Sequence, residues 1–271
     1  MKSVVVITGD ELRHKYFRIA LANDDRFKVV STYCEGVELS LEARTNKNPN
    51  SSLLEKLHVS ARKQSEDDFF EAISKKLIDR SNPVKIGKGR INDTNLVREI
   101  KKLNPELLVC YGSSLIKAEL LEAFEGRFLN VHLGLSPYYR GSGTNVWPLV
   151  NNETFMVGAT YMHIDAGIDT GKIIHQIRAD IFLGDSPHSI GNRLIKKMTG
   201  VYADIISSYE NLSDEEQPKS DGKLYKMKDF DDAACRTLYN NFSEGMIERH
   251  VFRSAERGLP YIVKNAALKK A

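Results

Sequence analysis

Short runs of β-branched and other apolar residues recur along the first half of the chain, and polar stretches with helical spacing separate them. The runs at 3–8, 27–33, 106–112 and 128–134 have the length and the residue types of buried strands. One amphipathic stretch follows the first run, and another lies between the last two. Strands that alternate with helices predict a parallel sheet with right-handed crossovers.

The second half of the chain adds a different pattern. Two β-rich runs, 157–164 and 172–181, flank a loop of Gly and Asp residues and predict a hairpin-like pair of strands. A long helix is predicted to begin after Ser186, a good N-cap residue, with Pro187 in its first position. The apolar positions that repeat at helical spacing behind Pro187 are Ile190, Leu194, Met198, Val201 and Ile205.

The sharpest change in composition falls at residues 211–222, which are almost entirely polar. We therefore expect a main domain over residues 1–212 and a C-terminal extension over residues 213–271, with a strand-like piece and one or two helices. The expected fold class is α/β, a Rossmann-like parallel sheet with a small C-terminal α+β extension. The extension carries apolar residues that either form a homodimer face or pack on their own domain, namely Leu238, Phe242, Met246, Ile247 and Val251.

Composition and charge narrow the classes of function. The chain has 271 residues, 41% of them hydrophobic and 28% charged, which is ordinary for a globular protein. Its formal net charge of +3 is too small to indicate a nucleic-acid partner. The three cysteines lie far apart without a CxxC pair, which favours buried, reduced thiols over disulfides or a metal site. No apolar run has the length of a signal peptide or a membrane span, so we expect a cytoplasmic protein without a membrane partner.

The run at 128–134 ends in polar residues where a strand that only packs would continue with Val or Ile. Asn130 and His132 point to one face of this strand, while Leu129 and Val131 point to the other. Polar groups at the carboxyl end of a parallel strand lie where open α/β sheets bind ligands. The second candidate segment is "DAGIDTG" (165–171), here called the Asp loop, whose glycines allow sharp bends.

These two segments resemble a known family. "NVHLGLSP" (130–137), "YYRG" (138–141) and "HIDAGIDTGKII" (163–174) are similar to the folate-dependent formyltransferases, a group that includes glycinamide ribonucleotide formyltransferase, methionyl-tRNA formyltransferase and the sugar N-formyltransferases. The resemblance covers roughly residues 85–205. Each segment alone is weak evidence, but both in this order, one crossover unit apart, are specific. The resemblance implies a Rossmann-like formyltransferase domain and an enzyme that takes its formyl group from 10-formyltetrahydrofolate.

The resemblance also implies a catalytic trio of Asn130, His132 and Asp169. When an amine attacks the formyl carbon, an oxyanion develops that the Asn130 amide and a protonated His132 suit as hydrogen-bond donors. A carboxylate at Asp169 would favour protonated His132 and orient a water that moves the proton from the amine. The plainer alternatives are a structural histidine at a strand end and an aspartate that only forms a turn, which is also the role expected for Asp165.

A pterin slot built mainly from backbone is a further implication of the resemblance, because backbone groups can match the donors and acceptors of the pterin edge. The loop after the run at 106–112, the end of the catalytic strand and the Asp loop supply it. The residues assigned to this folate site are Ser113, Ser114, Leu115, Ile116, Gly134, Leu135, Ser136, Pro137, Ala166, Gly167 and Ile168. Ser113 and Ser114 depart from the bulkier residues that are usual in the family.

The acceptor is narrowed by features that the family members differ in. The segment after the first strand has no Gly/Ser-rich turn for the phosphate of glycinamide ribonucleotide. The tail after residue 222 is short for the oligonucleotide-binding barrel of methionyl-tRNA formyltransferase and has no basic stripe. We therefore expect a small-molecule acceptor, an amino sugar linked to a nucleotide. The residues expected to contact it are Tyr139, Arg140, Arg13 and His14, with Arg62 as a further phosphate contact.

Two alternative functions stay open from the sequence. A hydrolase would send the formyl group to water, as the deformylase relatives do, although those usually carry an N-terminal regulatory module that is not seen in this sequence. A protein that only binds folate or a nucleotide sugar is the other alternative, and it has no need of the complete trio.

Overall fold

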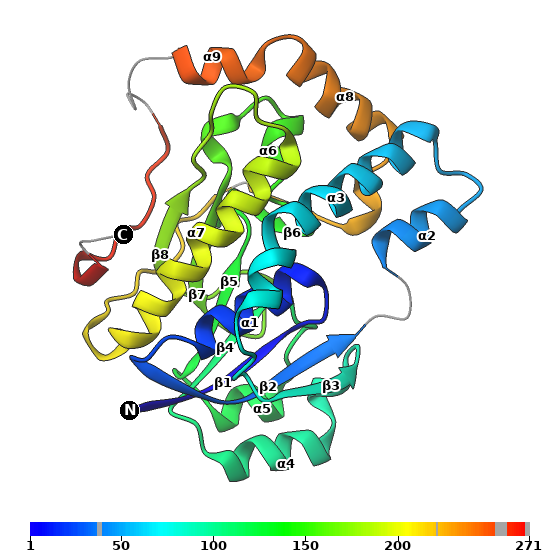
Figure 1. Cartoon of the computed structure of the whole chain (residues 1–271). Coiled ribbons are helices and arrows are strands. Elements are labelled where there is room, and N and C mark those ends of the chain that lie inside the picture. Colours follow the sequence, from blue (N-terminus) through cyan, green and yellow to red (C-terminus); the bar gives the residue numbers. More distant parts are fainter. Residues whose placement is uncertain (37–39, 221, 253–258, 269–271) are drawn as a thin grey trace.

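The computed structural model describes residues 1–36, 40–220, 222–252 and 259–268. Its centre is a seven-stranded sheet with the strand order β3-β2-β1-β4-β5-β7-β8 (Figure 1). The mutually parallel strands are β1 (Lys2–Gly9), β2 (Phe27–Gly36), β3 (Pro83–Gly87), β4 (Leu107–Tyr111) and β5 (Phe128–His132). The predicted parallel sheet is confirmed.

The two remaining strands of the sheet, β7 (Gly158–His163) and β8 (Ile173–Arg178), run antiparallel to each other. β7 also runs antiparallel to β5, with Thr160 opposite His132. The hairpin-like pair is thus confirmed, and the connection between its strands is the Asp loop.

Helices cover both faces of the sheet, as parallel strands require. One face carries α1 (Leu12–Ala22), α3 (Leu53–Lys76) and α7 (Pro187–Ser207), and the other carries α4 (Thr94–Leu103) and α5 (Ala118–Ala123) (Figure 1). The alternation of β5 divides the core in the same way, since Leu129 and Val131 pack with the first group and Phe128 packs with the second. Asn130 and His132 therefore lie on the α4–α5 face.

The start of α7 follows the prediction in detail. Ser186 precedes the helix, its hydroxyl accepts a hydrogen bond from the backbone amide of Ser189, and Pro187 occupies the first turn. The predicted apolar positions of α7 are buried.

The remaining elements lie outside these layers. They are α2 (Leu41–Lys47), β6 (Tyr139–Gly141), α6 (Trp147–Val150), β9 (Lys223–Tyr225), α8 (Asp232–Ser243), α9 (Met246–Phe252) and the 3-10 turns at Arg90–Asn92, Thr154–Met156, Tyr209–Asn211, Met227–Asp229 and Ala266–Leu268. β6 and β9 pair in parallel as a second, two-stranded sheet.

The described part of the C-terminal extension packs on the main domain. Tyr225, Leu238 and Met246 belong to the same hydrophobic cluster as Val4 of β1. Glu215 forms a bridge with Ile173 of β8, and α8 and α9 lie across the end of the molecule next to α6 (Figure 1). The apolar residues of α8 and α9 thus contribute to the core of this chain.

β3 is the strand that the hydrophobic pattern does not predict. Its residues "PVKIG" are mostly exposed and pair only with β2 at the edge of the sheet. An edge strand needs no buried apolar face, so periodicity gives no signal for it. Among the helices in the described ranges, none is long and apolar enough to cross a membrane.

Candidate active site

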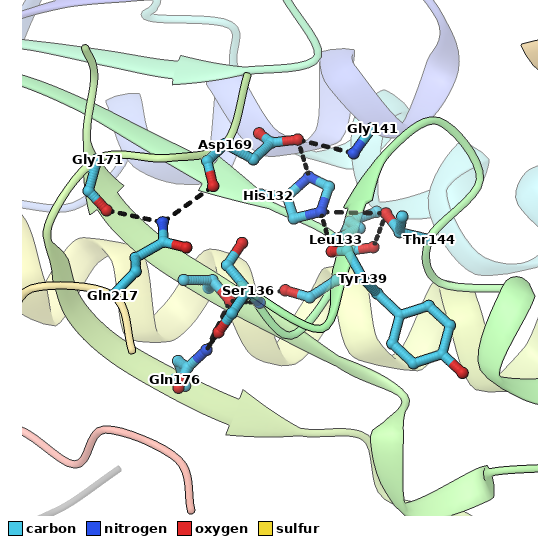
Figure 2. Close-up of polar contacts among 12 residues, drawn as sticks. His132, Leu133, Ser136, Tyr139, Gly141, Thr144, Asp169, Gly171, Gln176 and Gln217 are labelled. Atoms are coloured by element: carbon cyan, nitrogen blue, oxygen red, sulfur yellow. Dashed lines mark hydrogen bonds and ion pairs between the residues drawn. The ribbon is translucent and has the colours of Figure 1, made fainter. Parts of the chain in front are cut away.

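His132 lies at the carboxyl end of β5, between the Asp loop and the segment that follows the strand (Figure 2). Its Nδ1 is 3.3 Å from Asp169 Oδ2, and its Nε2 is 2.9 Å from the carbonyl oxygen of Tyr139. Only 7% of the residue is exposed. Two segments distant in sequence thus bring an imidazole and a carboxylate together, as the sequence predicts.

Thr144 indicates where the hydrogen atoms lie around this imidazole. The Thr144 hydroxyl donates to the carbonyl of Leu133 at 2.6 Å, so its oxygen is left to accept from His132 Nε2, 3.2 Å away. The Tyr139 carbonyl is also an acceptor, and Asp169 offers its carboxylate to Nδ1. All these groups accept hydrogen bonds, an arrangement that a doubly protonated imidazole satisfies at both nitrogens.

Asp169 is held in place by both its side chain and its backbone. Its φ of 54° lies in the left-handed region, which aspartate tolerates better than most residues. Oδ2 accepts from the backbone amide of Gly141 at 2.9 Å. Gln217 Nε2 donates to the carbonyls of Asp169 and Gly171, at 2.9 and 2.8 Å (Figure 2). Oδ1 of Asp169 makes no hydrogen bond within the described part of the chain, which leaves it open to a ligand.

The other aspartate of the Asp loop shapes the turn. Asp165 Oδ1 accepts from the Gly167 amide at 3.0 Å and from the Thr170 hydroxyl at 2.8 Å. The side chain is therefore occupied within its own loop, and the turn role expected for Asp165 is confirmed.

Asn130 lies two residues before His132 on the same face of β5 and is partly exposed. Its neighbours Leu129 and Val131 are buried in the core on the opposite face. The Asn130 side chain makes no hydrogen bond to a residue that the structure describes. Its amide is consequently available as a donor beside the imidazole.

Gly134 permits the close packing around His132. A methyl group at this position would overlap His132 Nε2, the Tyr139 carbonyl and the Thr144 side chain. The chain can bring these three groups together only because residue 134 has no side chain.

The segments assigned to the folate site are fixed by buried polar side chains. Glu35 of β2, 5% exposed, accepts from the backbone amide of Ser114. Thr160 Oγ1 accepts from the backbone amide of Ser136 at 3.0 Å, and Gln176 Nε2 donates to the Ser136 carbonyl at 2.8 Å. These contacts set the backbone of two segments, which suits a slot that reads its ligand through backbone groups.

Exposure differs between the three segments of the predicted folate site. Ser113 and Ser114 are partly buried, residues 134–137 are buried, and residues 166–168 are exposed. The side chains of Ile116 and Leu135 belong to the core, so only their backbone can face a ligand. In contrast, Leu115 and Ile168 are 60% and 48% exposed, and they present apolar surface on two of the three segments.

The residues predicted to contact the acceptor have different surroundings. Tyr139 turns its carbonyl to His132 while its ring points away (Figure 2), toward Glu153 and Asn151, which bond to its hydroxyl. The ring lines a hollow of about 830 Å³ on that side of β6. Arg140 follows Tyr139 in β6, and its Nε is buried without a partner among the described residues.

Arg13 and His14 lie in a separate polar cluster at the start of α1. Arg13 pairs with Glu66 at 2.9 Å and with Glu11. His14 is 5% exposed and fills the space beside Gly9 and Gly112. In the described ranges, no contact joins either residue to His132 or Asp169.

Two residues that support the catalytic pair are not predicted from the sequence. Thr144 lies in a loop of small residues, and Gln217 lies in the polar stretch at 211–222. Neither has a neighbour in sequence that marks it, because both act on groups far along the chain. Among the described residues, no group of three His, Cys, Asp or Glu side chains could hold a metal ion, and Cys34, Cys110 and Cys235 are buried.

Comparisons with known proteins agree with this geometry. The family model described as formyl transferase matches residues 1–206. A methionyl-tRNA formyltransferase from Thermodesulfovibrio yellowstonii is 36% identical over 119 residues, which are 43% of this chain and 37% of that protein. The chain therefore spans only 37% of the length of this curated relative.

Solved structures share the fold. A sugar N-formyltransferase from a Shewanella species has a TM-score of 0.55 and 21% identity, and covers 84% of this chain and 78% of its own. The N-formyltransferase from Helicobacter canadensis, solved with folinic acid and dTDP-3-aminofucose, has a TM-score of 0.53 and 18% identity, with 83% of this chain and 71% of that chain covered. At such identities the likeness shows the fold, and the expected α/β class is confirmed.

Proposed function

Because the chain belongs to the formyl transferase family, we propose that it transfers a formyl group from 10-formyltetrahydrofolate to a primary amine. The family resemblance of the sequence is confirmed by the match over residues 1–206. One observation carries the proposal of an active site rather than a folate-binding remnant. His132 and Asp169 lie 3.3 Å apart, next to an Asn130 amide that has no partner among the described residues.

The reaction sets two tasks for the protein. The amine nitrogen forms a bond to the formyl carbon, and the bond from that carbon to N10 of the folate breaks. The amine loses one proton and tetrahydrofolate gains one, so the exchange balances. The protein must therefore stabilise negative charge on the formyl oxygen and handle that proton.

Asn130 and His132 suit the first task. The Asn130 amide is a free donor for the formyl oxygen. Both nitrogens of His132 already face acceptors in the protein, at 3.3 Å and 2.9 Å, so we infer that a protonated His132 contributes mainly as a fixed positive charge beside that oxygen. A single preorganised donor of this kind is worth about 100-fold to 1,000-fold in rate.

Asp169 suits the second task. Oδ2 is occupied by His132 and by the Gly141 amide, while Oδ1 has no partner among the described residues. Oδ1 is therefore the atom that we expect to accept the proton of the attacking amine, directly or through a water. The hydrogen bonds from Gln217 keep the loop, and with it this oxygen, in position.

The donor fits the three segments of the folate site. A pterin ring has apolar faces and a polar edge. Leu115 and Ile168 offer exposed apolar surface for the faces. The hydroxyls of Ser114 and Ser136 are buried without partners among the described residues, and they add unpaired polar groups for the edge.

For the acceptor we propose a nucleotide-linked amino sugar. The described part of the extension consists of β9, α8 and α9, which is no framework for an oligonucleotide-binding barrel. The net charge of +3 adds no basic surface for transfer RNA. The relative from Helicobacter canadensis was solved with dTDP-3-aminofucose, an acceptor of the proposed class.

The test is a transfer assay with matched variants. Purified protein is incubated with 10-formyltetrahydrofolate and a panel of nucleotide-linked amino sugars, and both tetrahydrofolate and the formamide product are measured. We expect His132→Gln to lower turnover by at least about 100-fold. His163→Gln is the control, because it removes another His–Asp pair, 3.4 Å from Asp214 Oδ2, without touching the catalytic pair.

Each alternative predicts a different result. Release of tetrahydrofolate at the same rate without any amine would identify a hydrolase. Folate binding without turnover for any acceptor would identify a binding protein. Full transfer by the His132→Gln variant would reject the roles assigned here.

A further inference from the structure

A second polar cluster lies between α1, α3 and α7, at the carboxyl ends of β1 and β4. We name it the Arg62 cluster, and it consists of Arg13, His58, Arg62, Glu66, Tyr111 and His188. All its members are buried or partly buried. Tyr111 ends β4, the strand next to β5. The cluster therefore lies at the sheet edge where parallel α/β folds bind ligands.

The two arginines of the cluster differ in their pairing. Glu66 accepts from the Arg13 backbone amide at 3.0 Å and from its guanidinium at 2.9 Å, and Glu11 pairs with the same guanidinium. Arg62 makes no hydrogen bond or ion pair with a residue in the described ranges. Burial and the charge of Arg13 lower its pKa. A partly buried guanidinium without a counter-ion at contact distance is costly for the protein alone.

Two further groups next to Arg62 lack partners. The Tyr111 hydroxyl and His188 Nε2 are buried and unpaired among the described residues. The charge of Arg62 acts on the pKa of both side chains, so the three groups are close enough to meet one ligand. Burial, His58 and Arg62 lower the pKa of His188 to about 3, so its ring is neutral and offers an N–H. One cation and two neutral donors suit an anion rich in oxygen, such as phosphate.

The Arg62 cluster is connected to the catalytic pair by the loop after β6. Thr144 contacts His132 Nε2 at 3.2 Å. The next residue, Asn145, lies against Gly191 of α7, one helical turn beyond His188. A ligand of moderate length can therefore reach from the cluster to the imidazole along this loop.

We propose that the Arg62 cluster binds a phosphate group of the acceptor. This inference rests on the proposed function and narrows its acceptor to an amine that carries a phosphate. The guanidinium of Arg62 pairs with the phosphate, and the Tyr111 hydroxyl and His188 Nε2 donate to it. Phosphate held there fixes one end of the acceptor and leaves its amine to reach Asn130 and Asp169.

Binding of uridine diphosphate, measured by calorimetry, tests the cluster without any catalytic step. The variants are Arg62→Gln and, as control, Lys63→Gln, which removes the same charge from the next position of α3, where Lys63 pairs with Asp67 on the surface at 2.6 Å. We expect Arg62→Gln to weaken binding at least about tenfold and Lys63→Gln to leave it unchanged. Tyr111→Phe, which removes only the hydroxyl, should weaken binding a few-fold. Circular dichroism checks the fold of each variant.

The outcomes separate this inference from the proposed function. No binding to the wild-type protein at millimolar concentration, or equal binding by wild type, Arg62→Gln and Tyr111→Phe, would overturn the inference. Binding of transfer RNA in place of uridine diphosphate would overturn the small-molecule acceptor. Arg62-dependent binding in a protein without transfer activity would keep the site and reject the transferase. In an active enzyme, Arg62→Gln should raise the KM of the phosphorylated acceptor and leave kcat and the KM of the folate unchanged.

Discussion

The atoms that face His132 determine what this residue can do. Asp169 faces one nitrogen, and the Tyr139 carbonyl and the Thr144 hydroxyl face the other. A satisfied buried ion pair contributes little by itself to stability, but removing one of its partners costs about 3–5 kcal/mol. The arrangement therefore gives the site a defined charge and orientation more than it stabilises the fold.

Thr144→Val removes the hydroxyl that faces the imidazole and keeps the size of the side chain. We expect kcat to fall about tenfold, since a hydrogen bond to a charged group contributes about 1.5 kcal/mol. The KM of the folate should not change. Thr237→Val is the control, because the Thr237 hydroxyl bonds within α8 at 2.9 Å, away from the site. Steady-state kinetics of the two variants would contradict the role of Thr144 if their kcat values were equal.

Gly134→Ala places a methyl group against His132 Nε2 and the Tyr139 carbonyl. We expect the imidazole to move and activity to fall at least about 100-fold, with a loss of about 1–3 kcal/mol in the free energy of unfolding. Gly200→Ala is the matched control, because nothing lies within 4 Å of its added methyl group in α7. There the change should raise stability by about 0.5–1 kcal/mol. Activity assays and urea unfolding of both variants check these signs.

At the scale of elements, the strands and loops that carry the trio could be predicted, and their supports could not. β5 and the Asp loop combine local signals, namely alternation in the strand and glycines in the turn. Gln217 and Thr160 hold those segments through contacts with distant residues, which leave no local pattern. The same reason applies to Arg62, whose unpaired state depends on how Glu66 is shared with Arg13.

β8 and the C-terminal segment are joined by a histidine that titrates. His175 is 2% exposed, and its Nδ1 accepts from the Asn265 amide at 3.0 Å. Burial and then the charge of Lys264 lower the pKa of His175 from 6.5 to about 4. The unfolded chain binds the proton first as the pH falls, so the stability from neutral His175 is complete above pH 6.5 and is lost as the pH falls through about 4.

His175→Asn tests this pH dependence, since the Asn side chain keeps an acceptor and does not titrate. We expect the free energy of unfolding of the wild type to fall between pH 6.5 and 4 by up to about 1.4 kcal/mol per pH unit more than that of the variant. His58 and His188, whose pKa values are also lowered, keep part of the slope in both proteins. Urea unfolding at several pH values measures the difference, and parallel curves would contradict it.

At the scale of the whole molecule, the extension completes the domain that the sequence separates from it. β9 pairs with β6, and Tyr225 of β9 stacks on Trp147 with ring centroids 4.4 Å apart. We propose 1–212 as the catalytic domain and 213–271 as an extension that closes its core. The change in composition at 211–222 indicates where the chain leaves the parallel sheet, but composition carries no information on where the chain returns.

A chain shortened to residues 1–212 tests how far the catalytic domain depends on the extension. The hydrophobic cluster would lose Tyr225, Leu238 and Met246, and burying such side chains contributes about 1.5–3 kcal/mol each. We expect the fragment to lack near-ultraviolet circular dichroism and protease resistance. Gln217→Ala in the full chain is the companion variant, because it removes only the hydrogen bonds to Asp169 and Gly171. It should fold with a near-normal Tm and lose about tenfold in kcat. A folded, active fragment would instead make the extension a separate appendage.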